Sequence, residues 1–573
     1  NLTARFNITD WLYRQGRVGQ DFYSRDVDYN LPTGSQRQSA PPPGFVNGQY
    51  VQDLRRFREI NADFLIGADK TFGNFGVSIN AGGNQMYRRS DVNTELGENF
   101  FTRGLYTIGN ASKVTPNYSI SERQVNSLYA AAELSYNGFL YLNATVRNDW
   151  FSTLSAANRS ILYPSITGSY VFTESMSNLP SWLRFGKLRL AYAEVGSDTD
   201  VSPYANNLFY GINAQQFPNP SGSFQPVGSI NGSTVPNADL RPMRVKEKEI
   251  GVELTLLRNL QLELSYYHKV SSDQILQAQI SDASGFLTQL INVGESENRG
   301  VEMFLGVSPV KSENFEWNSS VNATYNTSKV LSLGDDVDGT FITVGSAEFH
   351  GELRQVVGEE MAQLYGWGYL RDAQGRQVFD PNNGRPLRSE EQLAFGSALP
   401  KWWGGFTNQL IYKDLSFSFL IDFKLGHKMI SGTHTNAYRH GLDKATLVGR
   451  DVGYVIGEGV NPNGEINTTQ ALIQPYYETI RSGRMSEQSV FNAGSWQLRQ
   501  ISLGYDLGKL IPNNKFITGA RVNLVANNVA VLKKWVPHIH PDQNGIIADT
   551  DVGLEATGLP VTRSIGFNLN LKF

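Results

Sequence analysis

The chain has 573 residues, with 50 basic and 54 acidic side chains and a formal net charge of -4. This near balance offers no strongly basic face, so nucleic acid is not an expected partner. The absence of cysteine excludes disulfide scaffolds, thiolate zinc sites and cysteine nucleophiles. The sequence contains no run of about 18 consecutive apolar residues, so it predicts no membrane-spanning helix. No signal peptide precedes Asn1, so we expect either a mature chain or one whose front end is missing.

Alternation of apolar and polar residues is the dominant local pattern. In residues 259–268, which read NLQLELSYYH, three leucines fall on one face of an extended strand, and Gln261, Glu263 and Ser265 fall on the other. The same pattern recurs in residues 138–147, 414–423 and 564–573. These segments have the length of membrane-spanning β-strands, about 9 to 11 residues or more.

The pattern predicts about sixteen strands, with boundaries good to a few residues. They lie near 2–11, 55–70, 73–88, 122–137, 138–150, 161–174, 183–196, 244–258, 259–272, 297–309, 314–329, 401–412, 414–426, 493–507, 516–528 and 562–573. Tight links are expected at 73–74, 137–138, 258–259, 309–314, 413–414 and 508–515. Long loops are expected at 12–54, 89–121, 197–243, 273–296, 330–400, 427–492 and 529–561.

Short turns that alternate with long loops are typical of an outer-membrane barrel, whose turns face the periplasm and whose loops face outside. A soluble β-sandwich shows the same alternation of side chains but rarely this regularity of links. Lipid offers no partner to unpaired amides, so a spanning sheet must close. The chain also ends on an aromatic residue, Phe573, which fits an outer-membrane assembly signal. We therefore predict an all-β, antiparallel transmembrane barrel over residues 1–573.

Several segments resemble the SusC/RagA family of TonB-dependent outer-membrane transporters of the Bacteroidota. YPSITGSYVFTES (163–175) and GKLRLAYAEVGSD (186–198) resemble two consecutive strands of that family. INVGESENRGVEM (291–303) resembles its NVGEMENKGVEL hairpin and is the most specific match. The resemblance continues in order from near residue 120 to the C-terminus. One local departure is the run Ile539-His540-Pro541-Asp542, where the family often has IDPE, so no role is carried over for this acidic pair.

The resemblance implies a barrel of 22 strands with a plug, a TonB box and a small N-terminal domain. Nothing in this sequence corresponds to the plug or to those leading parts, so roughly six strands and the plug are expected on residues outside it. The family resemblance further implies active import of a bulky nutrient, driven by the TonB complex. It also implies a SusD-like surface lipoprotein as lid and a dimer of such units. A glycan and an oligopeptide are the two leading substrate classes.

Two other functions stay open at this stage. One is a passive porin, or a barrel for surface binding or assembly, without energised transport. The other is a soluble carbohydrate-active β-protein, which would need a catalytic carboxylate pair that the sequence does not reveal. The sequence contains no GxSxG, HExxH or GxxxxGK[ST] motif, so we expect no enzyme and no cofactor.

Histidines and acidic residues offer two weak metal motifs. His538, His540 and Asp542 resemble a cluster of ligands, but Pro537 and Pro541 favour a rigid turn there. We therefore predict no metal site at that run.

The other histidines of the long loops, His427, His434 and His440, are expected to be solvated or to contact ligand rather than to coordinate a metal. The run from Asp380 resembles the start of a calcium loop, but Arg385 occupies the sixth position, which requires glycine. A turn is the better interpretation.

Aromatic residues make up 12% of the chain. Girdles of tyrosine and tryptophan at the two membrane interfaces explain most of them. Others lie in loops expected over the lumen, mixed with hydrogen-bond donors, and such mixtures suit sugars or peptides. The candidate substrate-binding residues are Trp367, Tyr369, Arg371, Tyr438, His440, Tyr476 and Tyr477.

Overall fold

A computed structural model describes residues 1–36, 45–198, 201–218, 220–230, 232–334, 340–347, 351–508, 516–543 and 552–573. The chain divides into two compact units, which are described separately. Unit 1 comprises 1–168, 192–246 and 273–292, and unit 2 comprises 169–191, 247–272 and 293–573.

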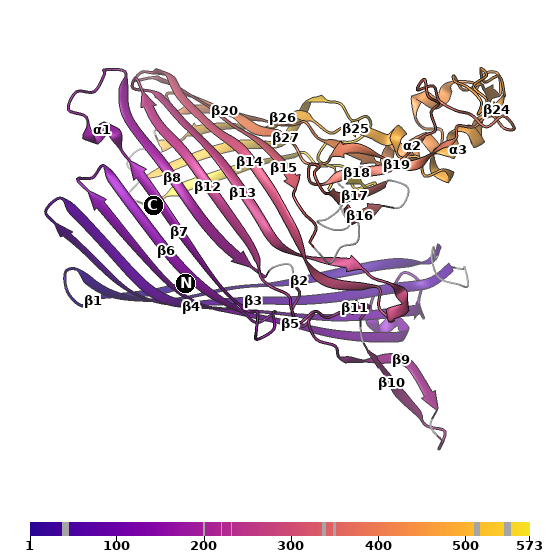
Figure 1. The fold of residues 1–573 in the computed structure, drawn as a ribbon, viewed down its shortest axis with the longest axis horizontal. Helices are drawn as coiled ribbons and strands as arrows, with labels where there is room; N and C mark the ends of the chain where they lie inside the picture. Colours follow the sequence, from indigo (N-terminus) through magenta and orange to yellow (C-terminus); the bar gives the residue numbers. More distant parts are fainter. Residues whose placement is uncertain are drawn as a thin grey trace. The chain divides into compact units, whose positions relative to one another are not determined.

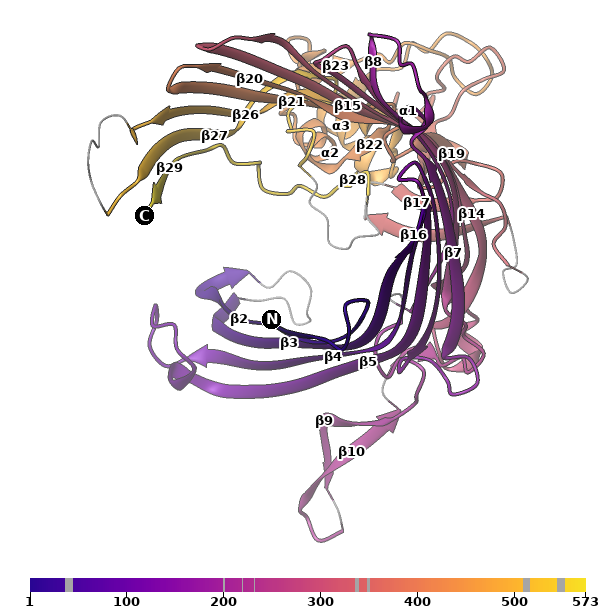
Figure 2. The same ribbon diagram turned by 90° about the vertical axis from the view of Figure 1, so that its left-hand side faces the viewer.

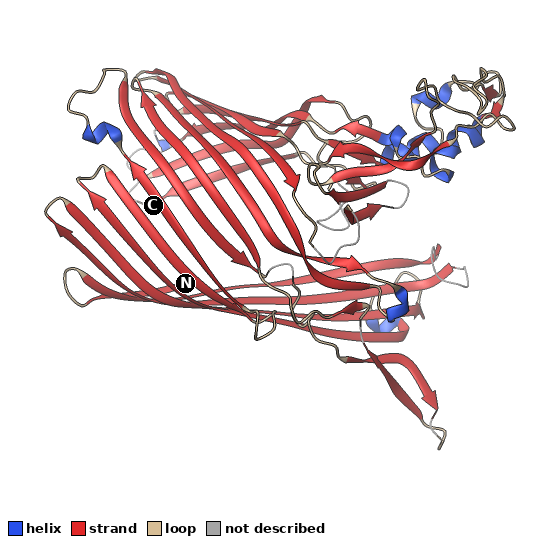
Figure 3. Ribbon diagram, viewed as in Figure 1, coloured by secondary structure: helices blue, strands red, loops and turns tan. Residues whose placement is uncertain are grey.

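Strands dominate both units (Figure 3). Among the described residues, the largest sheet contains β1 (Leu2–Asn7), β2 (Leu12–Gln36), β3 (Phe45–Phe72), β4 (Phe75–Phe100), β5 (Ala111–Tyr136), β6 (Leu140–Phe151), β7 (Ser160–Tyr170), β8 (Leu183–Ser197), β11 (Thr234–Val235), β12 (Met243–Leu256), β13 (Leu260–Gln279), β14 (Thr288–Lys311), β15 (Phe315–Val330), β20 (Trp402–Tyr412), β21 (Leu415–Leu425), β26 (Ser495–Asp506), β27 (Gly519–Lys534) and β29 (Ser564–Lys572).

The remaining elements are short. The smaller sheets contain β9 (Tyr210–Pro218), β10 (Phe224–Ile230), β16 (Phe341–Ala347), β17 (Gly351–Val356), β18 (Gln363–Tyr369), β19 (Arg388–Ser397), β22 (Lys428–Ser431), β23 (Tyr454–Val455), β24 (Ala471–Leu472), β25 (Val490–Asn492) and β28 (Leu554–Glu555). The helices are α1 (Phe172–Ser175), α2 (Gly432–Arg439), α3 (Ile473–Ser482), η1 (Ile108–Asn110), η2 (Asp282–Ser284), η3 (Lys444–Leu447) and η4 (Glu487–Ser489). No helix in the described ranges is both long and apolar enough to cross a membrane.

In unit 1, strands β1 to β6 pair antiparallel with their neighbours in chain order (Figure 1). The turn from β3 to β4 is tight, because Phe72 pairs with Phe75 and Gly73 adopts a left-handed φ of 58° that glycine reaches at no steric cost. The turn from β5 to β6 also uses left-handed backbone, at Asn137 and Gly138. Both tight links were predicted from the sequence.

Side-chain exposure in β6 follows the predicted alternation. Leu140, Leu142 and Val146 are 47%, 46% and 41% exposed, whereas Tyr141 and Asn143 between them are partly buried. A soluble sheet would bury the apolar side chains and expose the polar ones. The inverted arrangement indicates that the apolar face meets hydrocarbon.

In unit 2, β14, β15, β20, β21, β26, β27 and β29 pair antiparallel in that order. Three insertions interrupt this order and carry the smaller elements. The segment between β15 and β20 forms the four-stranded sheet β16-β17-β18-β19. The segment between β21 and β26 contains α2 and α3, and β28 from the third insertion pairs parallel with β22 beside α2 (Figure 2).

Two of the predicted long loops are wrong over most of their length. Residues 12–36 of the expected loop 12–54 form β2, which pairs with β1 and β3, and β3 begins at Phe45. In the expected loop 89–121, β4 runs to Phe100 and β5 starts at Ala111. These strands exceed the length needed to cross a bilayer. The part of a strand that extends beyond the bilayer lies in water and needs no apolar face. Its sequence therefore shows no alternation of apolar and polar residues.

The strand count is therefore higher than the sixteen predicted. Each predicted strand overlaps a strand of the largest sheet, and β2 and the two-residue β11 are additional among the described residues. The expected loop 273–296 is shortened in the same way, because β13 reaches Gln279 and β14 starts at Thr288. Most of the tight link predicted at 508–515 lies outside the described residues.

Candidate functional site

Three aromatic side chains line one face of β18 in unit 2. Tyr365, Trp367 and Tyr369 alternate with Gly366 and Gly368, so the three rings point to the same side of the strand. We call these three residues the aromatic stripe. All three rings are partly exposed, whereas both glycines are buried. The sequence analysis identified Trp367 and Tyr369 but missed Tyr365, although the alternation YGWGY contained the signal.

The glycines of β18 permit a close approach on the other face. A Cβ atom at Gly366 would lie 2.6 Å from Ser486 Oγ, and one at Gly368 would lie 2.4 Å from Leu393 Cδ1. The backbone N–H of Ser486 donates to the carbonyl of Trp367 over 2.8 Å. The segment before η4 therefore packs directly on β18 and holds the stripe in place.

Arginines cover parts of the stripe. The guanidinium of Arg388 lies 4.1 Å from the centroid of the Trp367 ring, and that of Arg354 lies 4.8 Å from the Tyr365 ring. Such cation–π contacts are typically worth about 0.5 to 2 kcal/mol. They orient the rings. Arg354 is already paired with Glu352 and Gln392. Of these two arginines, only the exposed Arg388 therefore offers a cationic donor that suits a ligand with carbonyl or hydroxyl oxygens.

The end of the stripe is fixed by Glu487 and Gln488 of η4. Glu487 accepts a hydrogen bond from the backbone N–H of Tyr369 over 2.8 Å and pairs with Arg371 over 2.5 Å. The hydroxyl of Tyr369 donates to Gln488 Oε1 over 3.0 Å. The sequence analysis predicted Tyr369 and Arg371 but missed both residues of η4, because the contacts join positions more than a hundred residues apart.

Three further predicted tyrosines come from α2 and α3. The rings of Tyr438 and Tyr477 meet edge to face at 5.2 Å between centroids, and those of Tyr476 and Tyr477 do the same at 5.2 Å. Burial raises the pKa of Tyr369 well above its ordinary value, and the neighbouring hydroxyls of Tyr438 and Tyr476 act in the same direction. The structure therefore brings Tyr438, Tyr476 and Tyr477 together as one aromatic cluster, and Tyr369 lies close enough to feel the hydroxyls of Tyr438 and Tyr476.

Tyr477 differs from the other members of the cluster, because it is only 5% exposed. Its hydroxyl donates to the carbonyl oxygens of Ala445 and Val448, at 3.1 Å and 3.0 Å. These contacts tie α3 to η3. Tyr477 is thus a buried support for the cluster. The ring faces that can contact a ligand belong to the other tyrosines.

His440 lies apart from this arrangement. It is exposed at the C-terminal end of α2, where its backbone N–H donates to the carbonyl of Asn436 over 3.0 Å. In the described ranges, no side-chain hydrogen bond or ring contact joins His440 to the aromatic cluster. The predicted residues other than His440 thus lie on β18, just after it at Arg371, and on α2 and α3 of unit 2.

The turn predicted at Asp380 is confirmed. Its carboxylate accepts hydrogen bonds from the backbone N–H and the amide of Asn382, and Gly384 has a left-handed φ of 68°. The oxygen atoms of Asp380 are thus used within the turn itself.

The run His538-Ile539-His540-Pro541-Asp542 separates into two parts. Asp542 pairs with Arg499 over 2.8 Å and with Lys424 over 3.4 Å, and its own backbone N–H donates to His540 Nδ1. Nε2 of His538 instead lies within hydrogen-bonding distance of Asp443 Oδ2, at 2.6 Å. His538, His540 and Asp542 therefore do not converge on one point, as the predicted turn implied.

Unit 1 contains a polar hollow of about 440 Å³. Its charged groups are already matched, because Glu122 accepts hydrogen bonds from Tyr87 and Arg89, and Arg123 pairs with the buried carboxylate of Asp198. The described residues of this hollow therefore present no unmatched charge to a ligand.

A family model for the TonB-dependent receptor-like β-barrel matches residues 1–529. This chain belongs to that family. It is therefore an outer-membrane β-barrel protein, and its family is one of transporters and receptors rather than enzymes. The expectation of an all-β transmembrane barrel is confirmed, as is the resemblance to SusC/RagA proteins.

Curated relatives and solved structures agree with this assignment. The chain is 21% identical over 568 residues to TonB-dependent receptor P3 of Formosa agariphila, covering 92% of this chain and 54% of that protein. It is 22% identical over 443 residues to SusC of Bacteroides thetaiotaomicron, covering 75% of this chain and 42% of SusC. A solved structure of the RagAB peptide transporter matches the fold with a TM-score of 0.78 at 17% identity, covering 100% of this chain and 61% of that chain. The chain thus spans about half the length of the curated relatives it matches.

Proposed function

We propose that the chain forms the barrel of a TonB-dependent importer that carries a bulky polar nutrient across the outer membrane. The family match over residues 1–529 is the observation that carries this proposal. Import would be energised by the TonB complex acting on a plug outside this sequence. A SusD-like surface lipoprotein would cover the long loops, and such units would pair into a dimer. The name of SusC as a TonB-dependent receptor and that of RagAB as a peptide transporter support energised import, and the lipoprotein partner rests on the family resemblance.

The aromatic stripe and the aromatic cluster form the proposed capture face. Rings stack on the apolar faces of sugars or on peptide side chains, and arginines and carboxamides bind the polar groups between them. Trp367 and Tyr369 would contact the ligand from β18, and Arg371 would contact it from the segment that follows β18. Tyr438 and Tyr476 would contact it from the helices, with Tyr477 behind them. His440 would act at the rim of this face. An oligopeptide and a glycan both satisfy these requirements.

Uptake by whole cells tests the energised mechanism. We expect cells with intact TonB to accumulate either a fluorescent oligopeptide pool or a labelled oligosaccharide pool. Cells without TonB should not accumulate that pool. The pool that is accumulated identifies the substrate class. Uptake that persists without TonB would contradict the proposal and favour a passive pore.

Substitution of the stripe tests the capture face. Trp367→Ala with Tyr369→Ala should weaken ligand capture, because it removes two stacking surfaces worth about 0.5 to 1.5 kcal/mol each beyond their buried area. Tyr210→Ala is a matched control, since Tyr210 is 79% exposed and lies outside the stripe and the cluster. Heat-modifiable migration in gels reports barrel folding. Unchanged uptake by a folded double variant would refute the proposed face.

A further inference from the structure

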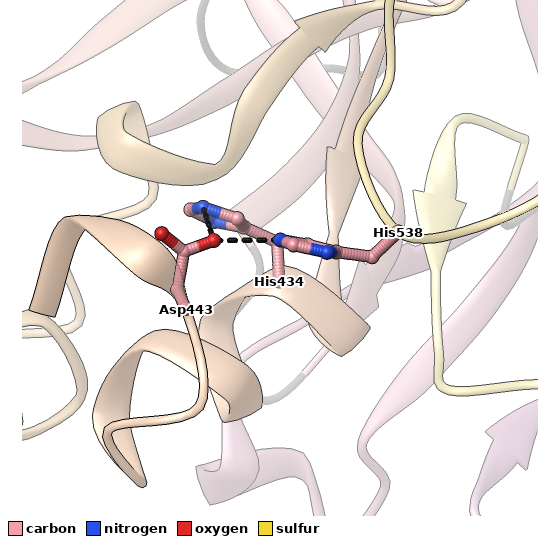
Figure 4. Close-up of side chains that lie close together, drawn as sticks. All are labelled: His434, Asp443 and His538. Atoms are coloured by element: carbon pink, nitrogen blue, oxygen red, sulfur yellow. Dashed lines mark hydrogen bonds and ion pairs between the residues drawn. The ribbon is translucent and has the colours of Figure 1, made fainter.

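Two histidines and one aspartate of unit 2 converge on a single point (Figure 4). His434 belongs to α2, Asp443 precedes η3, and His538 follows β27. Their potential ligand atoms all lie within 4.8 Å of one another. Asp443 Oδ2 lies 2.6 Å from His538 Nε2 and 3.6 Å from His434 Nε2. We call these three residues the His-Asp-His cluster.

His434 is held in a fixed orientation. The residue is 5% exposed, and its backbone N–H donates to the side chain of Ser431 at the start of α2 over 3.1 Å. Its ring Nδ1 lies 3.1 Å from the hydroxyl of Ser489, and its ring meets that of Phe491 edge to face at 4.9 Å. Because Nδ1 is occupied in this way, Nε2 is the ring nitrogen left to face Asp443. Metal-binding histidines are commonly oriented by such a hydrogen bond to the second nitrogen.

Asp443 presents one oxygen to both rings. Its Oδ1 accepts a hydrogen bond from the backbone N–H of Ala445 over 2.7 Å, which leaves Oδ2 for the histidines. Metal binding uses a carboxylate and neutral imidazoles, so an ion here would displace any proton carried by Nε2 of either histidine.

The spacing is close to that of a metal centre. The 3.6 Å between His434 Nε2 and Asp443 Oδ2 exceeds a hydrogen bond, so that nitrogen has no proton partner on the carboxylate. Ligand atoms about 2 Å from a tetrahedral metal lie roughly 3.3 Å from one another. The 3.6 Å between His434 Nε2 and Asp443 Oδ2 is close to this value. The 2.6 Å between His538 Nε2 and Asp443 Oδ2 is a hydrogen bond, which a bound ion would replace with release of its proton.

We propose that His434, Asp443 and His538 bind a divalent transition-metal ion of the Zn²⁺ type. Two imidazole nitrogens and one carboxylate oxygen suit Zn²⁺, whereas Ca²⁺ and Mg²⁺ prefer sites made of oxygen atoms. The side chain of His538 is 37% exposed, which gives an ion a path from solvent and leaves room for water as a fourth ligand. Sequence spacing alone did not reveal the cluster, because His434 and His538 are far apart in the chain.

A bound ion would join the insertion that contains α2 to the segment after β27. The ring of His434 lies 5.9 Å from that of Tyr438, a member of the aromatic cluster. Metal binding would therefore also restrict the motion of Tyr438. The proposal of a metal site does not depend on the proposed function, because it rests only on the local geometry of the three residues.

Calorimetry on the intact transporter in detergent, stripped of metals with a chelator, tests the site. We expect saturable binding of one Zn²⁺ per chain, and a visible d–d absorption band when Co²⁺ is used in place of Zn²⁺. His538→Gln should weaken Zn²⁺ binding by roughly 100-fold and abolish the Co²⁺ band. We expect this variant to keep its fold, because the His538 side chain is 37% exposed and lies outside the strands, and heat-modifiable migration in gels checks this.

His268→Gln is the matched control, since His268 is a partly exposed histidine of β13 that lies outside both the His-Asp-His cluster and the capture face. It should bind Zn²⁺ as the parent protein does. Asp443→Asn keeps the shape of the side chain and should lose binding as His538→Gln does. The proposal is overturned if the parent protein shows no saturable binding, or if His538→Gln binds Zn²⁺ with unchanged affinity.

Discussion

Thr433 holds the carboxylate of Glu555 through two hydrogen bonds, one from its backbone N–H at 2.9 Å and one from its hydroxyl at 2.8 Å. Ser431 donates a third over 2.8 Å. Glu555 is fully buried, and its position at the first turn of α2 places a negative charge where a helix has unpaired N–H groups. This contact fastens the last insertion of unit 2 to the insertion that contains α2.

Replacing Glu555 should therefore release β28 from β22. Glu555→Ala leaves three donors without an acceptor, one of them fully buried and two partly buried, and we expect a loss of about 3 kcal/mol in local stability. Hydrogen exchange should then increase in residues 552–556 and in α2. Glu458→Ala is the control, because Glu458 is exposed in the same insertion as α2. Equal protection in both variants would contradict the role of Glu555.

His427 should make this region sensitive to acid. Burial, aided by the charge of Lys424, lowers the pKa of His427 from 6.5 to about 4. Its Nδ1 is buried and lacks a hydrogen-bond partner among the described residues. Between these two pKa values the unfolded segment binds more protons than the folded one, so stability falls as the pH falls.

The expected window for this loss runs from about pH 6.5 down to about pH 4. Limited proteolysis of the loops across this window measures it, and His427→Asn should flatten the pH dependence because asparagine does not titrate. His440→Asn should leave the dependence unchanged. A parent protein equally resistant at both ends of the window would show that the ring is not buried in neutral form.

Asp542 should anchor the segment after β27 to the barrel strands. Its carboxylate reaches Arg499 on β26 and Lys424 on β21, and it also accepts from Gln497 over 3.2 Å. Asp542→Asn removes the charge while keeping the shape, and we expect a loss of about 1 to 3 kcal/mol. A double-mutant cycle with Arg499→Gln measures the coupling. Additive effects of the two substitutions would exclude a direct interaction.

Charge should be tolerated on only one face of β6. Leu142→Arg places a cation on the apolar face and should destabilise the folded barrel by about 2 to 4 kcal/mol near the bilayer midplane. Asn143→Arg, one residue later and on the opposite face, should cost much less. Urea unfolding in lipid vesicles compares the two variants. Similar losses for both would mean that the two faces have the same surroundings.

The barrel strands were predictable because lipid and water act on alternate side chains and leave a period of two in the sequence. That signal found β6 and β29, whereas β2 was missed because most of its residues need no apolar face. The residues of the proposed capture face were identifiable only in part. Trp367 and Tyr369 stood out as loop aromatics, but Glu487 acquires its contacts with Tyr369 and Arg371 from a distant segment. Asp542 shows the same limit, since only the fold reveals its partner Arg499.

Spin labelling tests most directly whether alternate side chains face lipid and water. The chain contains no cysteine, so single cysteines at positions 140 to 146 of β6 can each be labelled cleanly. Collisions with oxygen report contact with hydrocarbon, and collisions with a polar nickel complex report contact with water. We predict that oxygen dominates at positions 140, 142, 144 and 146, and that the nickel complex dominates at 141, 143 and 145. Collision rates that do not alternate along these positions would contradict the claim that one face of β6 meets lipid and the other meets water.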